Sequence, residues 1–399
     1  MKKYLFLGAA WGQISPLSYF KNQDNVEIYI ADNQPNNPGH KISDKSFNVS
    51  TDDVSSLRKI VNEFEIDSVY CFASDVGQIS QSVLSQEIGQ HSNSIESIKT
   101  LTNKLFFREF LFNEGIQRNF FMELSSEDLA DQETLKKIID NIPLVVKPIH
   151  GSGSKGVNFI FCSNDLKLIN NSLKFSPSST VIIENFLHKE GMQICGDGYF
   201  EDSILKNFTT GDGHFYDDSS NKVPYAESFP STHSKEIISK AKLIIEKILK
   251  KVGYEKGPIN FDIIVVDNMP FIIEIAPRTG GNYIPDVIKK HNGVDLLRAT
   301  LNTYSDKHYK FDEQEGNIKY VSSYMIHSLK EGNFVSLQIK EDLLPYIYDK
   351  ILYVQKGDMV KEFTQGSHAI GNIKFQFPDF ETQREKMYSI NESINVHVN

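Results

Sequence analysis

The sequence has few cysteines, no long apolar run and no excess of basic residues. Its 399 residues include only three cysteines, at widely spaced positions, which excludes a disulfide framework or a cysteine metal quartet and favours a reducing cytoplasm. The N-terminal apolar run is too short for a signal peptide, and no uninterrupted apolar stretch reaches ~18 residues. The net charge of −10 argues against a general nucleic-acid binder. We therefore expect a cytoplasmic protein that binds neither membranes nor nucleic acids.

Several catalytic motifs are also missing. The loop at Gly8 and Gly12 lacks the G-x-G-x-x-G spacing of dinucleotide-binding proteins, so these glycines are interpreted as tight turns or a substrate edge. No Walker A sequence, no Gly-x-Ser-x-Gly elbow and no Cys/His or Glu-x-x-His spacing occurs. The sequence thus gives no sign of an NAD site, a hydrolase nucleophile or a zinc centre.

The first hundred residues alternate between short apolar runs and helical patterns. Residues 4–7, 26–30 and 68–72 read as buried strands, each followed by a loop with a small or acidic residue. Parallel strands joined by helices bring such loops to one edge of a sheet. We predict a parallel α/β domain over residues 1–98.

A glycine-rich loop separates two apolar, strand-like runs near the middle of the chain. Lys147 ends the first run, and the loop that follows contains Gly151, Ser152, Gly153, Ser154 and Gly156. Glycines leave backbone N–H groups free to converge on phosphate, and a lysine beside them supplies a charge. A polar hairpin turn without a ligand is the alternative. A mobile lid over a polyphosphate is the functional interpretation.

A second segment predicts a β-hairpin with one acidic residue on each arm. Asp262 and Glu274 lie in apolar runs on either side of turn residues near 267–270, so antiparallel pairing would bring them close together. Two adjacent carboxylates repel each other unless a cation separates them, and Mg²⁺ prefers oxygen ligands. A solvated pair on an exposed face is the alternative. Arg278 would lie near the same place and could stabilise a transferring phosphoryl group.

The order of these motifs along the chain resembles that of the ATP-grasp superfamily of carboxylate–amine ligases. The resemblance implies that Lys104 and Lys147 contact nucleotide phosphates, with the 151–156 loop covering them. Glu184 would lie at the adenine amino group, with the backbone of Phe186 and Leu187 as a hinge and Glu190 at the ribose. Asp262 and Glu274 would hold Mg²⁺, or Mn²⁺ in its place, and Arg278 would stabilise an acyl phosphate.

The same resemblance implies an architecture of mixed α/β and α+β domains. A parallel α/β domain would be followed by α+β ATP-grasp subdomains over 99–305, with a lid subdomain at about 143–187, and by a small β-rich closing domain over 306–399. The helix beginning near Asn103 contributes Leu101, Leu105, Arg108 and Phe112 at helical spacing, which we interpret as an apolar face. His150 and His214 are further loop candidates for a ligand contact, with solvated positions as the alternative.

One residue departs from the family pattern. The family commonly has Asn two residues after the second metal-binding glutamate, and this chain has Ala276, which leaves the number of metal ions open. We expect ATP and Mg²⁺ as cofactors and a small carboxylate and an amine as substrates. A bicarbonate-phosphorylating enzyme and a catalytically degenerate ATP-binding protein remain alternatives. The sequence does not identify the substrates, and a homodimer is an open possibility for its assembly.

Overall fold

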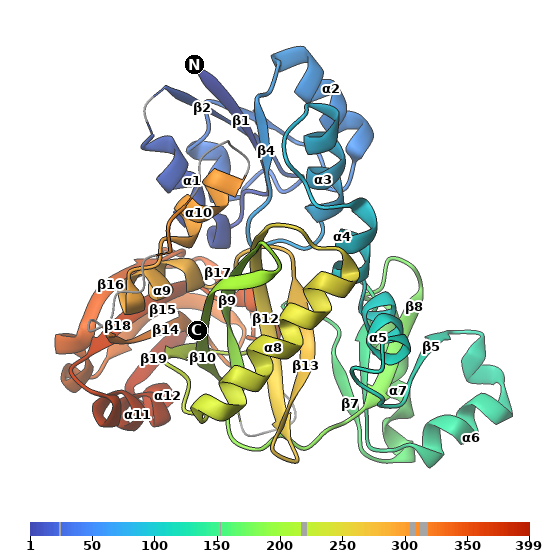
Figure 1. The fold of residues 1–399 in the computed structure, drawn as a ribbon. Helices are drawn as coiled ribbons and strands as arrows, with labels where there is room; N and C mark the ends of the chain where they lie inside the picture. The colour runs from blue at the N-terminus through green and yellow to red at the C-terminus, as the bar shows by residue number, and fades with distance from the viewer. Residues whose placement is uncertain (24, 152, 217–221, 304–308, 312–317) are drawn as a thin grey trace.

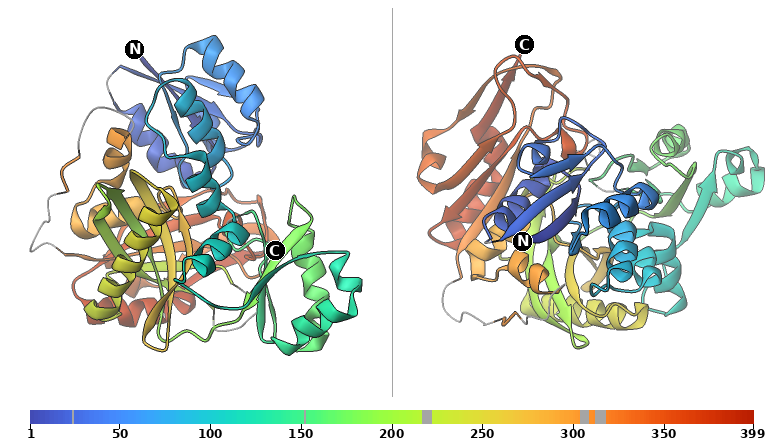
Figure 2. Two further views of the ribbon diagram at one scale, coloured as in Figure 1. Left: turned by 45° about the vertical axis from the view of Figure 1, so that its right-hand side comes forward. Right: turned by 90° about the horizontal axis from the view of Figure 1, so that it is seen from above.

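The computed structural model describes residues 1–399 except 24, 152, 217–221, 304–308 and 312–317. The N-terminal region lies above a large central sheet, with a smaller sheet at the right of the view and the C-terminal strands at the left (Figure 1). The views of Figure 2 show that the smaller sheet projects to one side of the molecule. The predicted fold class, mixed α/β and α+β with a parallel N-terminal sheet, is confirmed.

The N-terminal sheet has four strands in the order β3-β2-β1-β4, all parallel. Leu5 and Leu7 of β1 enter one buried core and Phe6 enters another, as expected for a strand covered on both faces. The predicted strands at 4–7, 26–30 and 68–72 are therefore present. The elements of this region are β1 (Lys2–Leu7), α1 (Ile14–Lys21), β2 (Val26–Ala31), β3 (Lys45–Phe47), α2 (Val54–Phe64), β4 (Ser68–Tyr70), α3 (Gln78–Glu87) and α4 (Ile95–Thr102).

The smaller sheet, here called the lid sheet, has four antiparallel strands in the order β5-β8-β6-β7. Its core includes Leu124, Val146 and Ile183, and the glycine-rich loop connects β6 to β7 as predicted. Its elements and the preceding helix are α5 (Lys104–Asn113), β5 (Phe121–Ser125), α6 (Gln132–Asp140), β6 (Leu144–Pro148), β7 (Asn158–Ile160), α7 (Lys167–Leu173) and β8 (Thr180–Asn185).

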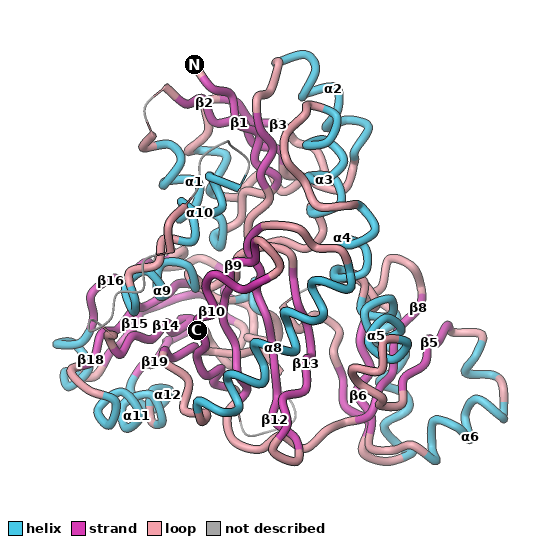
Figure 3. The backbone as a smooth tube through the Cα atoms, in the orientation of Figure 1, coloured by secondary structure: helices cyan, strands magenta, loops and turns pink. Residues whose placement is uncertain are grey.

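The large sheet has eight antiparallel strands in the order β13-β12-β9-β10-β11-β14-β18-β16. In Figure 3 it extends from β12 and β13 at the centre to β18 and β16 at the left. Side chains alternate between its faces, so Phe261 and Ile263 pack against α8 while Asp262 points to the other face. Its elements are β9 (Gln193–Glu201), β10 (Ile204–His214), β11 (Ala226–Phe229), α8 (Lys235–Val252), β12 (Gly257–Val266), β13 (Met269–Ala276), α9 (Ile284–Asn292), α10 (Leu296–Thr303), β14 (Tyr320–Ile326), β16 (Ile347–Leu352) and β18 (Gly371–Phe377).

The C-terminal residues contribute both to the large sheet and to a separate one. Strands β14, β16 and β18 extend the large sheet, while β15, β17 and β19 form a three-stranded sheet. The remaining elements are β15 (Gly332–Ile339), β17 (Met359–Val360), α11 (Phe380–Tyr388), α12 (Ile390–Ser393) and β19 (Ile394–Val398). No helix among the described residues combines the length and apolar character that a membrane crossing needs.

Candidate active site

A cleft of about 460 Å³, part of it open to solvent, lies between the lid sheet and the edge of the large sheet formed by β13. It brings together five of the predicted site residues: Lys104, Lys147, Gly151, Glu184 and Glu274. It also contains residues to which the sequence gave no site role, among them Arg108. Residues that are distant in the chain therefore surround one space.

Asp262 and Glu274 lie directly opposite each other in the antiparallel register of β12 and β13, as the hairpin prediction requires. Burial raises the pKa of Asp262 from 3.8 to about 6, and the charge of Glu274 adds to this effect. Gln193 Nε2 donates a 2.9 Å hydrogen bond to Asp262 Oδ1. The pair is thus an acidic site whose mutual repulsion a cation would relieve.

The donor set fits a magnesium ion that is shared with phosphate. Two carboxylates are the usual protein contribution to such an ion, with phosphate oxygens and water in the remaining positions. Among the described residues, no group of three or more His, Cys, Asp or Glu side chains is placed to hold a metal alone. Asp262 and Glu274 would therefore hold Mg²⁺ together with a nucleotide rather than in a closed protein cage.

Lys104 connects the start of α5 to both sides of the cleft. Asn103 caps this helix by accepting a hydrogen bond from Phe106 N at 3.0 Å, which fixes Lys104 in its first turn. Lys104 Nζ donates to Gly151 O at 2.6 Å and lies 4.0 Å from Glu274 Oε2. The side chain lies between the glycine-rich loop and the acidic pair, where a phosphate group would need a positive charge.

Glu184 and two cations form a buried cluster at the lid side of the cleft. Glu184 is 5% exposed and forms ion pairs with Lys147 and with Arg108, the latter at 2.5 Å between Nε and Oε2. Burial disfavours the ionised carboxylate, but the charges of Arg108 and Lys147 outweigh it and lower the pKa of Glu184 from 4.5 to about 2. Both carboxylate oxygens thus already accept hydrogen bonds from cations. Contact with an adenine amino group stays a prediction.

Arg108 is a residue whose role the sequence reasoning missed. Its guanidinium also donates to the carbonyl oxygens of Ile272 (3.2 Å) and Ile273 (2.7 Å) on β13. It therefore connects a lid strand to a strand of the large sheet. The sequence feature that could have indicated this role is an arginine within the apolar stripe of α5. A guanidinium buried there requires hydrogen-bond acceptors for its donors.

The glycine-rich loop has the backbone that its composition predicts. Gly156 has φ +74°, and a Cβ there would lie 2.8 Å from atoms of both Phe175 and Pro148, so no other residue fits without displacement. Ser154 Oγ donates to Lys222 O at 2.9 Å, and Gly153 O accepts a 3.4 Å hydrogen bond from Gly366 N. The loop thereby contacts the C-terminal part of the chain. Ser152, a predicted phosphate contact, lies outside the described residues.

The predicted hinge and ribose positions have specific partners. Phe186 N donates to Pro143 O at 2.9 Å, and the contact of the Leu187 backbone with a nucleotide base stays a prediction. Glu190 is exposed, and its carboxylate accepts a 3.2 Å hydrogen bond from Asn268 N at the β12–β13 turn. The structure thus gives Glu190 a bond to that turn, and its contact with ribose stays a prediction.

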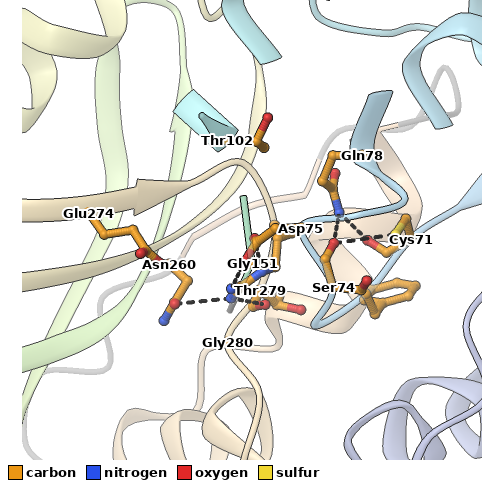
Figure 4. A network of polar contacts seen from close by, with 12 residues as sticks. Cys71, Ser74, Asp75, Gln78, Thr102, Gly151, Asn260, Glu274, Thr279 and Gly280 are labelled. Atoms are coloured by element: carbon orange, nitrogen blue, oxygen red, sulfur yellow. Dashed lines mark hydrogen bonds and ion pairs between the residues drawn. The ribbon is translucent and has the colours of Figure 1, made fainter. Parts of the chain in front are cut away.

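Arg278 is held by a residue of the N-terminal region. Its Nε and Nη2 donate to the two oxygens of Asp75 at 2.8 and 3.1 Å, and its Nη1 donates to Asn260 Oδ1 at 3.0 Å. Figure 4 shows Asp75 beside Thr279 and Gly280, with Asn260 approaching from β12. Asp75 is an acidic residue of the loop after the third predicted strand, and the sequence did not predict this pairing. Arg278 is therefore positioned before any substrate binds.

Asp197 fixes the loop that follows Arg278. This aspartate is fully buried and accepts hydrogen bonds from Gly280 N (2.9 Å) and from Asn260 Nδ2 (2.9 Å). Burial raises its pKa from 3.8 to about 7, against the opposing effect of these hydrogen bonds. Asp197 thus supports Asn260, which is one of the two side chains that orient Arg278, and nothing in the local sequence pattern marked it.

The two histidine candidates differ in position. His150 follows β6, and its Nε2 lies 3.4 Å from Asn103 Nδ2, next to the first turn of α5. His214 Nε2 lies 2.8 Å from Ser228 Oγ, on the sheet face opposite to Asp262, and burial lowers its pKa from 6.5 to about 4. His214 therefore lies away from the cleft.

The chain is similar to several known proteins at low sequence identity. No family model matches the sequence. The chain is 22% identical over 269 residues to the uncharacterized protein y4rH of Sinorhizobium fredii, covering 66% of this chain and 54% of that protein. It is 24% identical over 324 residues to the formate-dependent phosphoribosylglycinamide formyltransferase of Prochlorococcus marinus, covering 75% of this chain and 76% of the relative.

Other relatives match in part. The chain is 24% identical over 211 residues to the large chain of carbamoyl phosphate synthase from Sulfurisphaera tokodaii, and the match covers 50% of this chain. It spans only 19% of that relative, just as it spans about half of y4rH. The whole-protein activities of these relatives therefore do not transfer directly to this chain.

The solved structures match over the full length. The L-amino acid ligase from Bacillus licheniformis superimposes with a TM-score of 0.81 at 16% sequence identity, covering 100% of this chain and 99% of that one. The phosphoribosylglycinamide synthetase from Anaerococcus prevotii superimposes with a TM-score of 0.75 at 18% identity, covering 100% of both chains. At such identities the likeness establishes the fold. The chain has the fold of the ATP-grasp superfamily, as the order of its motifs predicts.

Proposed function

We propose that the chain is an ATP- and Mg²⁺-dependent ligase that joins a carboxylate to an amine and releases ADP and phosphate. The observation that carries the proposal is the meeting of Glu274 with Lys104 and Lys147 around one cleft, with Asp262 directly opposite Glu274 in the hairpin. Carboxylates that share a cation, opposed by lysines, match the charge pattern of a metal-bound polyphosphate. The names of the relatives, which include ligases and a synthase, support this reaction class.

In the proposed reaction, an oxygen of the carboxylate attacks the γ-phosphorus of ATP, and the bond to ADP breaks. The amine nitrogen then attacks the acyl carbon, the carbon–oxygen bond to phosphate breaks, and the amine proton passes to solvent. Lys104 and Lys147 would offset negative charge on the phosphates, and Arg278 would stabilise the acyl phosphate. Bound Mg²⁺ would supply further charge neutralisation. The loop over the cleft would keep water from the intermediate.

We infer that the site holds one metal ion rather than two. Ala276 offers no side-chain ligand at the position where the family commonly has Asn. Asn260 lies directly opposite Ala276 in the hairpin register, but its amide is bonded to Arg278 and Asp197. The amide nearest the missing ligand is therefore already used for positioning the arginine.

The test is to identify the nucleotide product formed from ATP and Mg²⁺ with pooled carboxylic acids and amines, with bicarbonate assayed separately. ADP and phosphate that depend on an organic acid would support the ligase, whereas AMP and pyrophosphate would exclude it. ADP formed with bicarbonate alone would favour a bicarbonate-phosphorylating enzyme. ATP binding without turnover would favour the degenerate protein. Glu274→Gln should abolish turnover. The control Glu236→Gln, which removes an exposed ion pair with Lys240 on α8, should leave turnover unchanged.

A further inference from the structure

We propose that Glu227 recognises the protonated primary amine of a substrate, so that one substrate of the chain is an ammonium-bearing molecule such as an amino acid. The reaction itself rests on the proposed ligase function. The inference adds a substrate class and a recognition residue to that site. It is carried by an unpartnered buried oxygen, by the position of Glu227 on the sheet and by the charges around it.

Glu227 on β11 has one oxygen bonded and one without a donor. The side chain is 3% exposed, and Oε1 accepts a 3.0 Å hydrogen bond from Asn282 Nδ2. Among the described residues, Oε2 has no hydrogen-bond donor. A buried carboxylate oxygen without a donor is unfavourable, so native proteins usually reserve such a position for a ligand, an ion or water.

The sheet register places Glu227 on the same face as the acidic pair. Gln193, Gly213 and Glu227 lie directly opposite one another on β9, β10 and β11, so they share one face. The side chain of Gln193 reaches Asp262, which places the acidic pair on this face too. Gly213 contributes no side chain of its own, and the ring of Phe215 lies 3.2 Å from where its Cβ would be. From β12 to β11 there are three strand spacings, about 14 Å, a span suited to a small organic molecule rather than a single ion.

The charges around Glu227 favour a cation. Asp262 and Asp197 act on it as neighbouring negative charges, and together with burial they raise its pKa from 4.5 to about 8. The cations of this face are already paired: Arg278 with Asp75, and Lys374 with Asp349 at 2.9 Å. A bound cation would offset these negative charges and favour the ionised form of the Glu227 carboxyl group.

The loop before α9 is shaped to hold Glu227 in place. Asn282 and Tyr283 are consecutive non-glycine residues with φ +53° and +64°, a left-handed conformation that persists only where the surroundings enforce it. This backbone directs the Asn282 amide to Glu227, while Ser323 Oγ donates to Asn282 O at 3.0 Å. At Gly281 an added Cβ would meet no atom within 4 Å, so open space borders the loop.

A binding experiment tests the inference without requiring turnover. Calorimetry and thermal shift would use the full chain with Mg²⁺ and a non-hydrolysable ATP analogue. The probes are matched pairs: alanine and propionate, leucine and 4-methylpentanoate, phenylalanine and 3-phenylpropionate, glutamate and glutarate. Ethylamine forms a separate arm. We expect the amino acid of at least one pair to bind at least tenfold tighter than its counterpart without the ammonium group, or ethylamine to bind measurably, as expected for a charge-assisted hydrogen bond. Binding of ethylamine would show that the recognised ammonium group belongs to the amine substrate. Selective binding of an amino acid, with no binding of ethylamine, would show that it belongs to the carboxylate substrate.

Glu227→Gln should remove this preference, leaving amino acid and deaminated acid within threefold of each other, while the control Glu236→Gln keeps it. Glu227→Asp, which retains the charge, should lose less than Glu227→Gln. Equal binding of both members of every pair to the wild type, with no ethylamine binding, would overturn the inference and leave Oε2 to a structural water. Unchanged selectivity in a folded Glu227→Gln variant would also overturn the inference. If that variant does not fold, the comparison of probe pairs on the wild-type chain still tests the inference.

The outcomes separate this inference from the proposed function. Selective binding of ammonium-bearing probes without release of ADP would support Glu227 as a recognition residue and count against the ligase. Release of ADP with deaminated acids as readily as with amino acids, together with no binding of ethylamine, would support the ligase and overturn the role of Glu227.

Discussion

Replacing Arg108 with methionine should strongly weaken the connection between the two sheets that enclose the cleft. Arg108 is 4% exposed and forms the 2.5 Å ion pair with Glu184 on β8. The same guanidinium donates to the carbonyl oxygens of Ile272 and Ile273 on β13. Methionine retains much of the side-chain length but none of the donors. The substitution therefore removes one ion pair and leaves two backbone acceptors without this donor.

Two independent arguments give the size of the effect. Removing one partner of a buried ion pair costs about 3–5 kcal/mol, because the other charge stays buried without compensation. The pKa of Glu184 falls from 4.5 to about 2 in the folded chain, which corresponds to roughly 3 kcal/mol of favourable interaction shared between Arg108 and Lys147. We therefore expect Arg108→Met to destabilise the fold by about 3 kcal/mol.

The effect can be measured by thermal and urea unfolding, together with hydrogen exchange of the β8 and β13 amides. Exchange is needed because a chain with several regions need not unfold in one step. The matched control is Lys251→Met, which removes a more exposed ion pair with Glu114 and should cost less than about 1 kcal/mol. A loss for Arg108→Met no larger than that of the control, with unchanged exchange in β8, would refute the reasoning.

Three further predictions concern the cleft and its loop. Lys147→Ala should raise the KM for ATP and slow phosphoryl transfer in steady-state assays, whereas the exposed Lys136→Ala should leave both unchanged. Gly156→Ala should lower the melting temperature, because its Cβ would lie within 2.8 Å of two side chains, while Gly366→Ala, which faces open space, should not. The folded pKa of Glu184 lies below its unfolded value, so its stabilisation is full above about pH 4.5 and is lost as the pH falls towards 2. The destabilisation caused by Glu184→Gln should accordingly shrink between pH 6 and pH 3 in unfolding measurements; a constant penalty would contradict the charge-based explanation.

The features that sequence could predict are those decided by neighbouring residues. The strand–glycine loop–strand unit and the β12–β13 hairpin each form within one short segment, so periodicity and turn residues were enough to predict them. The hairpin also fixed the facing of Asp262 and Glu274, because antiparallel register follows from the position of the turn.

The sequence by itself thus determined the fold class and the candidate phosphate and metal groups, since their geometry is local. Only the tertiary structure decided which charges meet across the chain. Asp75 and Arg278 are 203 residues apart, and Arg108 and Glu184 are 76 apart. Glu227 acquires its role from the register of three strands. A residue pattern carries no information on such partners, because packing brings their side chains together and burial then makes each unpaired charge costly.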